Sequence, residues 1–474
     1  MLGLSIGKPF DLGKPRGQRL YRAAATWEGC SILRRRSNLL PVESETTLWL
    51  GLEMTLIRPF KALRPLPQKA QELTAPPYDV LDSQEARAMA QGRPLSFLHI
   101  SKPEIDLDPE IDPYDEAVYL QGKENLRRLI DQGILVQDSQ PLYYFYEMSL
   151  GGHHQMGLVA AASVEKYDQN LIVKHELTRE DKELDRIRMI DTLNAQASPV
   201  LLAFLSQSKF SELAAKATRG AAQLSVQSDD GVTHRLWPVL DPALAKGISD
   251  LFNGPQAPVK KLYIADGHHR SASASKVAAK RKEANPKHTG DEPYNYFLAV
   301  LYPADQMKIL DYNRVVKDLN GLNQGDFVAQ VAQVFSLKAE VGPVRPEAPG
   351  EVGMYLKGQW YRLTAPSDKI PADPVAALDV SLLYDWLLQP LLGIGNPRKD
   401  KRIDFVGGAR GLSELEKRVD SGEMAVAFAM HPTQMEQVIA VAEAGEIMPP
   451  KSTWFEPKLV DGLVCHLLEE ALGG

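Results

Sequence analysis

Short apolar segments of strand length alternate with segments of helical periodicity along most of this chain, and this alternation restricts the fold more than any other feature. The aromatic and β-branched runs 142–148 and 155–164 flank Gly151-Gly152, which is typical of a β-hairpin. Further segments of strand length are 200–205, 259–265, 296–301, 309–312, 403–406 and 425–430, and helical patterns cover 83–91 with Ser83 as N-cap, 114–132, 178–194 and 209–217. This order predicts an α/β fold, α+β in character, with a mixed sheet.

Length and proline content indicate the domain organisation. At roughly 150 residues per domain, a chain of 474 residues corresponds to two or three domains. The stretch 342–374 contains six prolines around a hairpin-like pattern at 354–363. We therefore expect a main α/β domain over 54–340 and a C-terminal α/β subdomain over 341–474 that completes the functional site.

The first 53 residues differ in kind from the rest. They carry eight basic and five acidic residues, whereas the whole chain has a net charge of −7. No periodicity of 2 or 3.6 is sustained there, and no apolar core precedes a small-residue cleavage site as in a secretory signal. We expect residues 1–53 to be an appended, disordered extension with a functional start at Met54; a basic targeting peptide is the alternative.

Composition excludes several functional classes. A mildly acidic chain lacks the basic footprint of a nucleic-acid-binding protein. No apolar run approaches the roughly 20 residues that cross a bilayer, so no membrane partner is expected. Cys30 and Cys465 are the only cysteines and lie far apart, which argues against a disulfide framework or a Cys-based zinc site and favours the cytoplasm. The oligomeric state is left open.

The strongest candidate site is the segment Tyr263-Ile-Ala-Asp-Gly-His-His-Arg270. A strand ends at Ala265, Gly267 permits a turn, and a helix of small residues is expected to start near Arg270. Free amide groups and the positive end of a helix dipole favour an anion at such a turn, and His268, His269 and Arg270 add hydrogen-bond donors. The alternative is that Asp266 only caps the helix and that the histidines are exposed.

A second candidate is the segment 174–186. Thr178 and Asp181 resemble a capping box, which would place His175 and Glu176 just before a helix. Three basic residues then share one helix face and form a plausible second phosphate clamp, namely Arg179, Lys182 and Arg186. A solvated helix with ion pairs such as Lys182 with Asp185 explains the same pattern equally well.

Three weaker candidates follow along the chain. Gly407-Gly408 lies between a strand and a helix and is either an anion loop or only a turn. Lys451 lies on a proline-stiffened loop that suits ligand contacts or plain packing. Arg314 ends the segment Tyr312-Asn-Arg314 and is a candidate phosphate-binding residue. The alternative is that Tyr312 is a core residue and Arg314 a surface residue. No GxxxxGK[ST], GxGxxG, HRD or DFG motif occurs, and no GxSxG elbow lies between a predicted strand and a predicted helix.

Seven motifs together resemble domain-of-unknown-function family 1015 of bacteria and archaea, over Met54 to about His466. They are Ile57-Arg-Pro-Phe60, Ala75-Pro-Pro-Tyr-Asp79, His175-Glu-Leu-Thr178 with Asp181-Lys182 and Asp185-Arg186, Asp266-Gly-His-His-Arg270, Tyr312-Asn-Arg314, Phe405-Val-Gly-Gly408 and Met448-Pro-Pro-Lys-Ser-Thr-Trp-Phe455. The turn at 266–270 also resembles the phosphate-binding box of the ParB and sulfiredoxin superfamily. That second resemblance implies a ParB/sulfiredoxin-like nucleotide-binding core, with relatives that include free-serine kinases.

The leading hypothesis is a phosphotransferase that acts on a small hydroxyl metabolite, with free serine as one candidate, and uses a nucleotide (ATP or ADP) and Mg²⁺. Glu176 would be the general base, with Asp266 as the alternative base or a metal ligand. The residues 268–270 would hold the transferred phosphate, and Arg179 and Lys182 would balance charge. The alternatives are a nucleotide-binding regulatory module without turnover and a phosphatase of a small phosphorylated metabolite.

Overall fold

A mixed nine-stranded sheet forms the centre of the larger lobe. The computed structural model describes residues 55–469, so the expectation for residues 1–53 lies outside the described residues. Eight strands run in the order β6 (Ile172–Val173), β11 (Leu262–Asp266), β8 (Val200–Phe204), β12 (Tyr296–Pro303), β5 (His153–Ser163), β4 (Tyr144–Leu150), β10 (Thr233–Pro238) and β9 (Leu224–Gln227), and β1 (Ile57–Arg58) also pairs with β5. The pairs β6–β11 and β8–β12 are parallel and the others antiparallel, which confirms the predicted mixed α/β fold.

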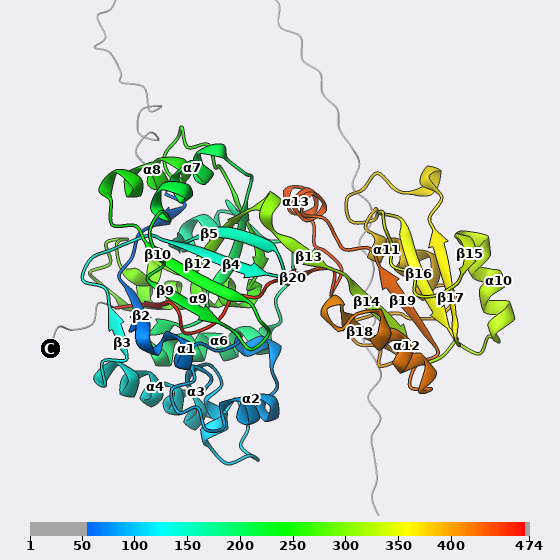
Figure 1. Ribbon diagram of the computed structural model, residues 1–474, viewed down its shortest axis with the longest axis horizontal. Helices are drawn as coiled ribbons and strands as arrows, with labels where there is room; N and C mark the ends of the chain where they lie inside the picture. Colours follow the sequence, from blue (N-terminus) through cyan, green and yellow to red (C-terminus); the bar gives the residue numbers. More distant parts are fainter. Residues whose placement is uncertain (1–54, 470–474) are drawn as a thin grey trace, which may run out of the picture. The chain divides into compact units, whose positions relative to one another are not determined.

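Both faces of this sheet are buried. Along β5, Leu158, Ala160 and Ala162 belong to one apolar cluster, whereas Val159 and Ala161 belong to another, as the alternation of a strand requires. The first cluster also contains residues of α5 (Val164–Asp168), α6 (Glu180–Leu193), α7 (Ser208–Ala217), α8 (Pro242–Phe252) and α9 (His268–Ala284). Figure 1 shows α7 and α8 beside each other, and they are in contact. Among the described residues, no helix is long and apolar enough to cross a membrane.

The end of the chain is built into the same lobe. β21 (Cys465–Leu467) lies between β2 (Ala62–Pro65) and β7 (Ala195–Gln196) in a four-stranded sheet that β3 (Leu135–Gln137) completes. Helices α1 (Ala70–Leu73), α2 (Ser83–Ala90), α3 (Leu98–Ser101) and α4 (Glu116–Asp131) contribute to the apolar cluster around it. The C-terminal strand therefore depends on partners from the first half of the chain.

A second sheet has six antiparallel strands. Their order is β15 (Ser336–Glu340), β17 (Gln359–Thr364), β16 (Glu351–Leu356), β19 (Val426–Met430), β14 (Tyr312–Val316) and β18 (Ile403–Gly407). Its helices are α10 (Gln324–Val334), α11 (Asp379–Leu383), α12 (Leu412–Asp420) and α13 (Met435–Glu443). The expected boundary between residues 340 and 341 falls inside this sheet, after β15.

A two-stranded ribbon separates the two sheets along the chain. It pairs β13 (Lys308–Leu310) with β20 (Trp454–Glu456). We call residues 55–307 and 457–469 the first lobe, and residues 312–453 the second lobe. Helix α13 contributes Met435 and Ala442 to a first-lobe cluster, and Val438 and Val441 to the second-lobe core, so it packs against both.

Four predicted helix starts were wrong. Helix α4 begins at Glu116 rather than at residue 114, because the Asp115 side chain caps it by accepting from the backbone N–H of Ala117. Asp82 rather than Ser83 caps α2, because its side chain accepts from the backbone of Glu85 in a complete capping box. Helix α6 begins at Glu180, since the Thr178 hydroxyl donates to the Glu183 side chain and caps no backbone group. Helix α9 begins at His268, two residues earlier than expected.

Gly462 controls how the C-terminal segment packs. Its φ is +93°, and an added Cβ would lie 2.8 Å from Leu73 and 3.0 Å from Phe97, both buried. We expect Gly462→Ala to lower the free energy of unfolding by about 2–4 kcal/mol, measured by urea denaturation. Gly445→Ala is the matched control, because φ is +70° but nothing lies within 4 Å. Equal losses in both variants would contradict a packing role for Gly462.

Candidate functional site

The turn between β11 and α9 is the structural centre of the site. Asp266 ends the strand, and Gly267 is the N-cap of the 17-residue helix with a φ of +101°. A Cβ on Gly267 would lie 3.3 Å from both Val200 and the Arg270 side chain, so the turn needs glycine for its conformation and for space. His268 and His269 occupy the first helical turn.

His268 pairs with the segment that carries Glu176. The backbone N–H of His175 donates to His268 Nε2 at 3.4 Å, which assigns the proton of the neutral imidazole to Nδ1. That Nδ1 lies 3.9 Å from a carboxylate oxygen of Glu176. Burial holds the pKa of His268 well below its usual value and lowers the pKa of His175 to about 4, so both rings are neutral at pH 7. The two residues far apart in sequence, 176 and 268, are thus brought together.

Glu176 is a partly exposed carboxylate whose pKa is raised. Its side chain is 44% exposed and therefore accessible to a ligand. Partial burial and the charge of Asp266 raise its pKa, while Lys451 and Arg398 act in the opposite direction. A carboxylate whose pKa is moved towards neutrality is suited to accept a proton from a hydroxyl group.

The guanidinium group of Arg270 is buried and bound to other residues of the protein. It is 6% exposed, its Nη2 lies 3.1 Å from Asp79 and 3.6 Å from Asp266, and its other amino group donates to the carbonyl of Pro199. Asp266 also pairs with Lys458 at 3.2 Å. Burial opposes the ionisation of Asp266, but Lys458 and Arg270 hold its pKa below the usual value. Arg270 thereby fixes the loop at 75–80 against the end of β11.

Two cavities meet beside this turn. The larger has a volume of about 1010 Å³ and the smaller about 340 Å³. Asp79, Glu176 and Lys451 line both of them. The larger is also lined by Tyr78, Tyr114, Arg179, Lys182, Arg186, His269, Arg398, Lys399 and Phe405, and the smaller by His175, Asp266, Tyr312, Ser452, Thr453, Trp454 and Lys458, among others. Glu176 thus lies where the cavities join.

The basic face of α6 lies at the wall of the larger cavity. Arg179 pairs with Asp181 at 2.7 Å, and its backbone N–H donates to His269 Nε2 at 3.0 Å. Lys182 donates to the hydroxyl of Tyr114 at 2.7 Å rather than pairing with Asp185. Arg186 is the partner of Asp185 at 2.7 Å, and its guanidinium group lies 3.9 Å from the ring centre of Tyr78. Thr178 lines neither cavity.

The glycine pair at 407–408 has a packing role. A Cβ on Gly407 would lie 2.9 Å from the Trp454 ring, and one on Gly408 would lie 2.8 Å from the carbonyl of Asp311. The N–H of Gly408 donates to that carbonyl at 2.7 Å and is therefore unavailable to an anion. Neither glycine lines either of the two cavities described above, so the turn interpretation explains them better than the anion-loop interpretation.

Arg314 acts on the site through Lys451. It is 3% exposed, and its guanidinium donates to the carbonyls of Tyr312 and Lys451, the latter at 3.0 Å. Lys451 has a φ of +58°, which is rare for a residue with a side chain. Thr433 fixes the same loop by donating to the carbonyl of Ser452 at 2.8 Å. The second lobe thereby holds Lys451 at the junction of the cavities.

Sequence reasoning missed two basic residues of the second lobe, Arg398 and Lys399. They line the larger cavity together with Pro397. A signal was present, because Asn396-Pro397 favours a turn and the next five residues include four basic ones in an acidic chain.

The structure is that of a mixed α/β protein with two neighbouring cavities that are lined by residues of both lobes. The chain belongs to the family described as Protein of unknown function (DUF1015), which matches residues 57–381. No curated protein matches the chain.

Similar solved structures include free serine kinase in complex with AMP, at 14% identity over 63% of this chain and 86% of that chain with a TM-score of 0.29. SbnI with a C-terminal truncation from Staphylococcus aureus matches at 13% identity, over 64% and 85% of the chains, with a TM-score of 0.34. A conserved hypothetical protein from Pyrococcus furiosus matches at 14% identity, over 65% and 95%, with a TM-score of 0.30.

Proposed function

We propose that this protein is a phosphotransferase that moves a phosphoryl group from a nucleotide, ATP or ADP, to the hydroxyl group of a small metabolite. The observation that carries the proposal is the position of Glu176 between a cavity of about 1010 Å³ and one of about 340 Å³. The larger volume suits a nucleotide and the smaller a metabolite. A donor and an acceptor in the two cavities would meet at a carboxylate able to act as base.

The wall of the larger cavity suits the parts of a nucleotide. Tyr78, Tyr114 and Phe405 offer aromatic surface for a base, and Lys182 and Lys451 offer positive charge for phosphates. Because His175 and His268 are neutral, they serve as hydrogen-bonding groups rather than as charges. Arg270, which is bound to Asp79 and Asp266, positions the turn.

The chemical step uses few groups. The acceptor hydroxyl oxygen attacks the terminal phosphorus, its proton passes to Glu176, and the bond from phosphorus to the bridging oxygen breaks to release the shortened nucleotide. His268 Nδ1 lies 3.9 Å from the Glu176 carboxylate, beyond direct hydrogen-bond distance, while His269 donates a hydrogen bond to the transferred group and Lys182 and Lys451 balance its negative charge.

Mg²⁺ fits the donor groups at the junction. Among residues 55–469, no cluster of three or more His, Cys, Asp or Glu side chains could hold a metal alone. Mg²⁺ commonly needs only one or two carboxylates together with phosphate oxygens and water, and Asp79 and Glu176 line both cavities. When bound, the ion would neutralise phosphate charge; Asp79 would hold it, with Asp266 as a second candidate.

Several finer assignments belong to the same proposal. Free serine is a candidate acceptor, and the turn at 266–270 serves as a phosphate box of the ParB and sulfiredoxin type. The protein acts in the cytoplasm on small molecules, without a nucleic-acid or membrane partner.

Phosphorus-31 NMR with ATP or ADP, Mg²⁺ and a panel of small hydroxyl metabolites tests the function. We expect a new phosphomonoester signal that requires the acceptor. Phosphate release without an acceptor would indicate a hydrolase, and nucleotide binding without turnover would indicate a regulatory module.

A further inference from the structure

We propose that Arg398 and Lys399 of the second lobe bind the phosphate chain of the nucleotide, so that both lobes are needed for a complete donor site. This inference rests on the proposed function and adds ligand-binding residues to it. Both side chains line the larger cavity, on which Glu176 and the basic face of α6 also lie. Arg398 is close enough to Glu176 to affect its ionisation.

Within residues 55–469, these two cations have no acidic partner at ion-pair distance. Among the described residues, neither has a carboxylate within 4.0 Å, and both are exposed. Other basic residues of the same cavity wall are ion-paired: Lys102 with Glu104 at 3.1 Å, Arg179 with Asp181 and Arg186 with Asp185 at 2.7 Å each. Arg398 and Lys399 are therefore free to pair with a ligand.

The charge of the ligand requires such residues. A nucleoside triphosphate carries about four negative charges, and phosphates are bound most strongly by charge-assisted hydrogen bonds. The turn at 266–270 supplies little positive charge, because Arg270 is bound to two carboxylates and burial lowers the pKa values of His268 and His269. Lys182, Lys451 and a bound Mg²⁺ would have to balance Asp79 and Glu176 of the same cavity wall as well as the phosphates, so further cations are needed.

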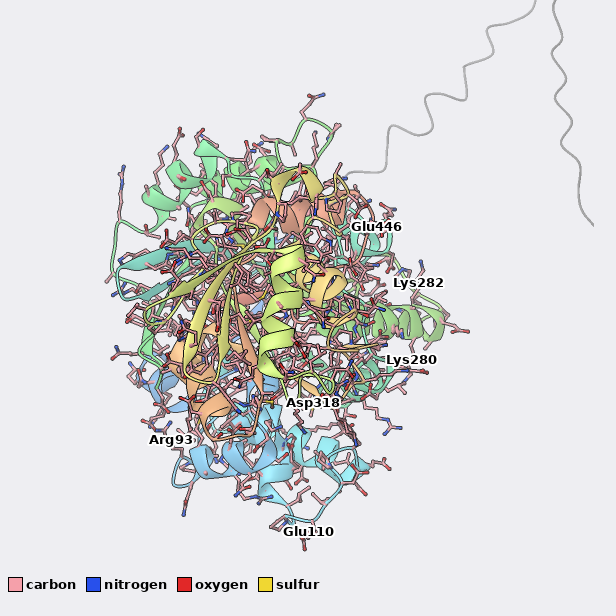
Figure 2. All side chains as sticks on the ribbon, turned by 90° about the vertical axis from the view of Figure 1, so that its right-hand side faces the viewer. Arg93, Glu110, Lys280, Lys282, Asp318 and Glu446 are labelled. Atoms are coloured by element: carbon pink, nitrogen blue, oxygen red, sulfur yellow. The ribbon has the colours of Figure 1, made fainter. Side chains whose placement is uncertain are left out.

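The loop that carries the pair is held in place by its own contacts. The side chain of Asn396 accepts from the N–H of Arg398 at 2.9 Å, and its carbonyl accepts from the N–H of Lys399 at 2.9 Å. At the C-terminal end of this loop, Arg402 pairs with Asp318 (labelled in Figure 2) at 2.6 Å. A fixed backbone with two unpaired basic side chains reduces the entropy lost when an anion binds.

Calorimetric titration of the full chain with ATP, ADP, AMP and inorganic triphosphate tests the assignment. We expect Arg398→Ala/Lys399→Ala to weaken ATP and triphosphate binding about 100-fold, ADP binding about 30-fold, and AMP binding less than 3-fold, because contacts to successive phosphates are lost. Lys401→Ala is the matched control, since Lys401 lies on the same loop but does not line the cavity, and its ATP affinity should change less than 2-fold.

The possible outcomes separate this inference from the proposed function. If the wild-type protein binds no nucleotide, the proposed function fails. If it binds ATP and the double variant binds ATP equally well, or loses ATP and AMP affinity to the same extent, only the assignment of the two side chains fails. Arg398→Gln with Lys399→Gln repeats the measurement with neutral polar side chains that are longer than alanine, and unchanged thermal melting verifies that either variant is folded.

Discussion

Replacing Glu176 by glutamine is expected to lower kcat for phosphoryl transfer by about 10³-fold, within the range that general-base catalysis contributes. Glutamine keeps the size of the side chain but cannot accept the hydroxyl proton. Nucleotide affinity should change less than about 3-fold, because the phosphate-binding cations remain. Single-turnover rates and calorimetric titration measure the two effects. A variant that retains full kcat, or one that loses nucleotide binding first, would show that Glu176 is not the base.

The pH profile gives an independent measure of the same group. Glu176 is faced by His268, Asp266, Lys451 and Arg398, and partial burial and the charge of Asp266 raise its pKa above the usual value of a glutamate. Because the ionised form is the active one, the rate should fall as the pH drops through this raised pKa. Lys451→Met removes a cation that favours ionisation, so the acid limb of the kcat profile should move to higher pH. An acid limb that stays in place would exclude Glu176 as the titrating group.

The pattern of strands was readable from the sequence because local rules determine it. Gly151-Gly152 separates two alternating runs, and the structure has β4 and β5 there as an antiparallel pair. The pairing of β21 with β2 and β7 joins residues more than 250 positions apart, and no local pattern specifies it. Helix starts failed where a neighbouring residue provided a better cap, as Asp82 does for α2.

For the site, the sequence predicted which residues come together better than it predicted the partners of each side chain. His268, Glu176 and Asp266 do come together, because a strand–turn–helix junction places its first helical residues beside the neighbouring chain segment. The role of Arg270 could not be read from the sequence, since its partners Asp79 and Pro199 lie more than 70 residues away. Arg398 was missed because a basic loop segment is usually only solvated.

Arg270 is expected to be a determinant of stability. Arg270→Met should lower the free energy of unfolding by about 3 kcal/mol, because the change leaves Asp79 and Asp266 without their shared cation and the Pro199 carbonyl without its donor. This loss of free energy is at the lower end of the range for breaking a buried ion pair, because the side chains of Asp79 and Asp266 are 38% and 32% exposed. Urea denaturation measures the loss.

Arg179→Met is the control, since Arg179 is 69% exposed and its pair with Asp181 should contribute less than about 0.5 kcal/mol. If Arg270→Met does not fold, Arg270→Lys keeps the charge but loses the forked geometry, and it should be intermediate in stability. Stability within about 0.5 kcal/mol of the wild type, combined with a large loss of ATP affinity, would instead make Arg270 a ligand-binding residue. The two measurements together distinguish a side chain that holds the turn from one that holds the phosphate.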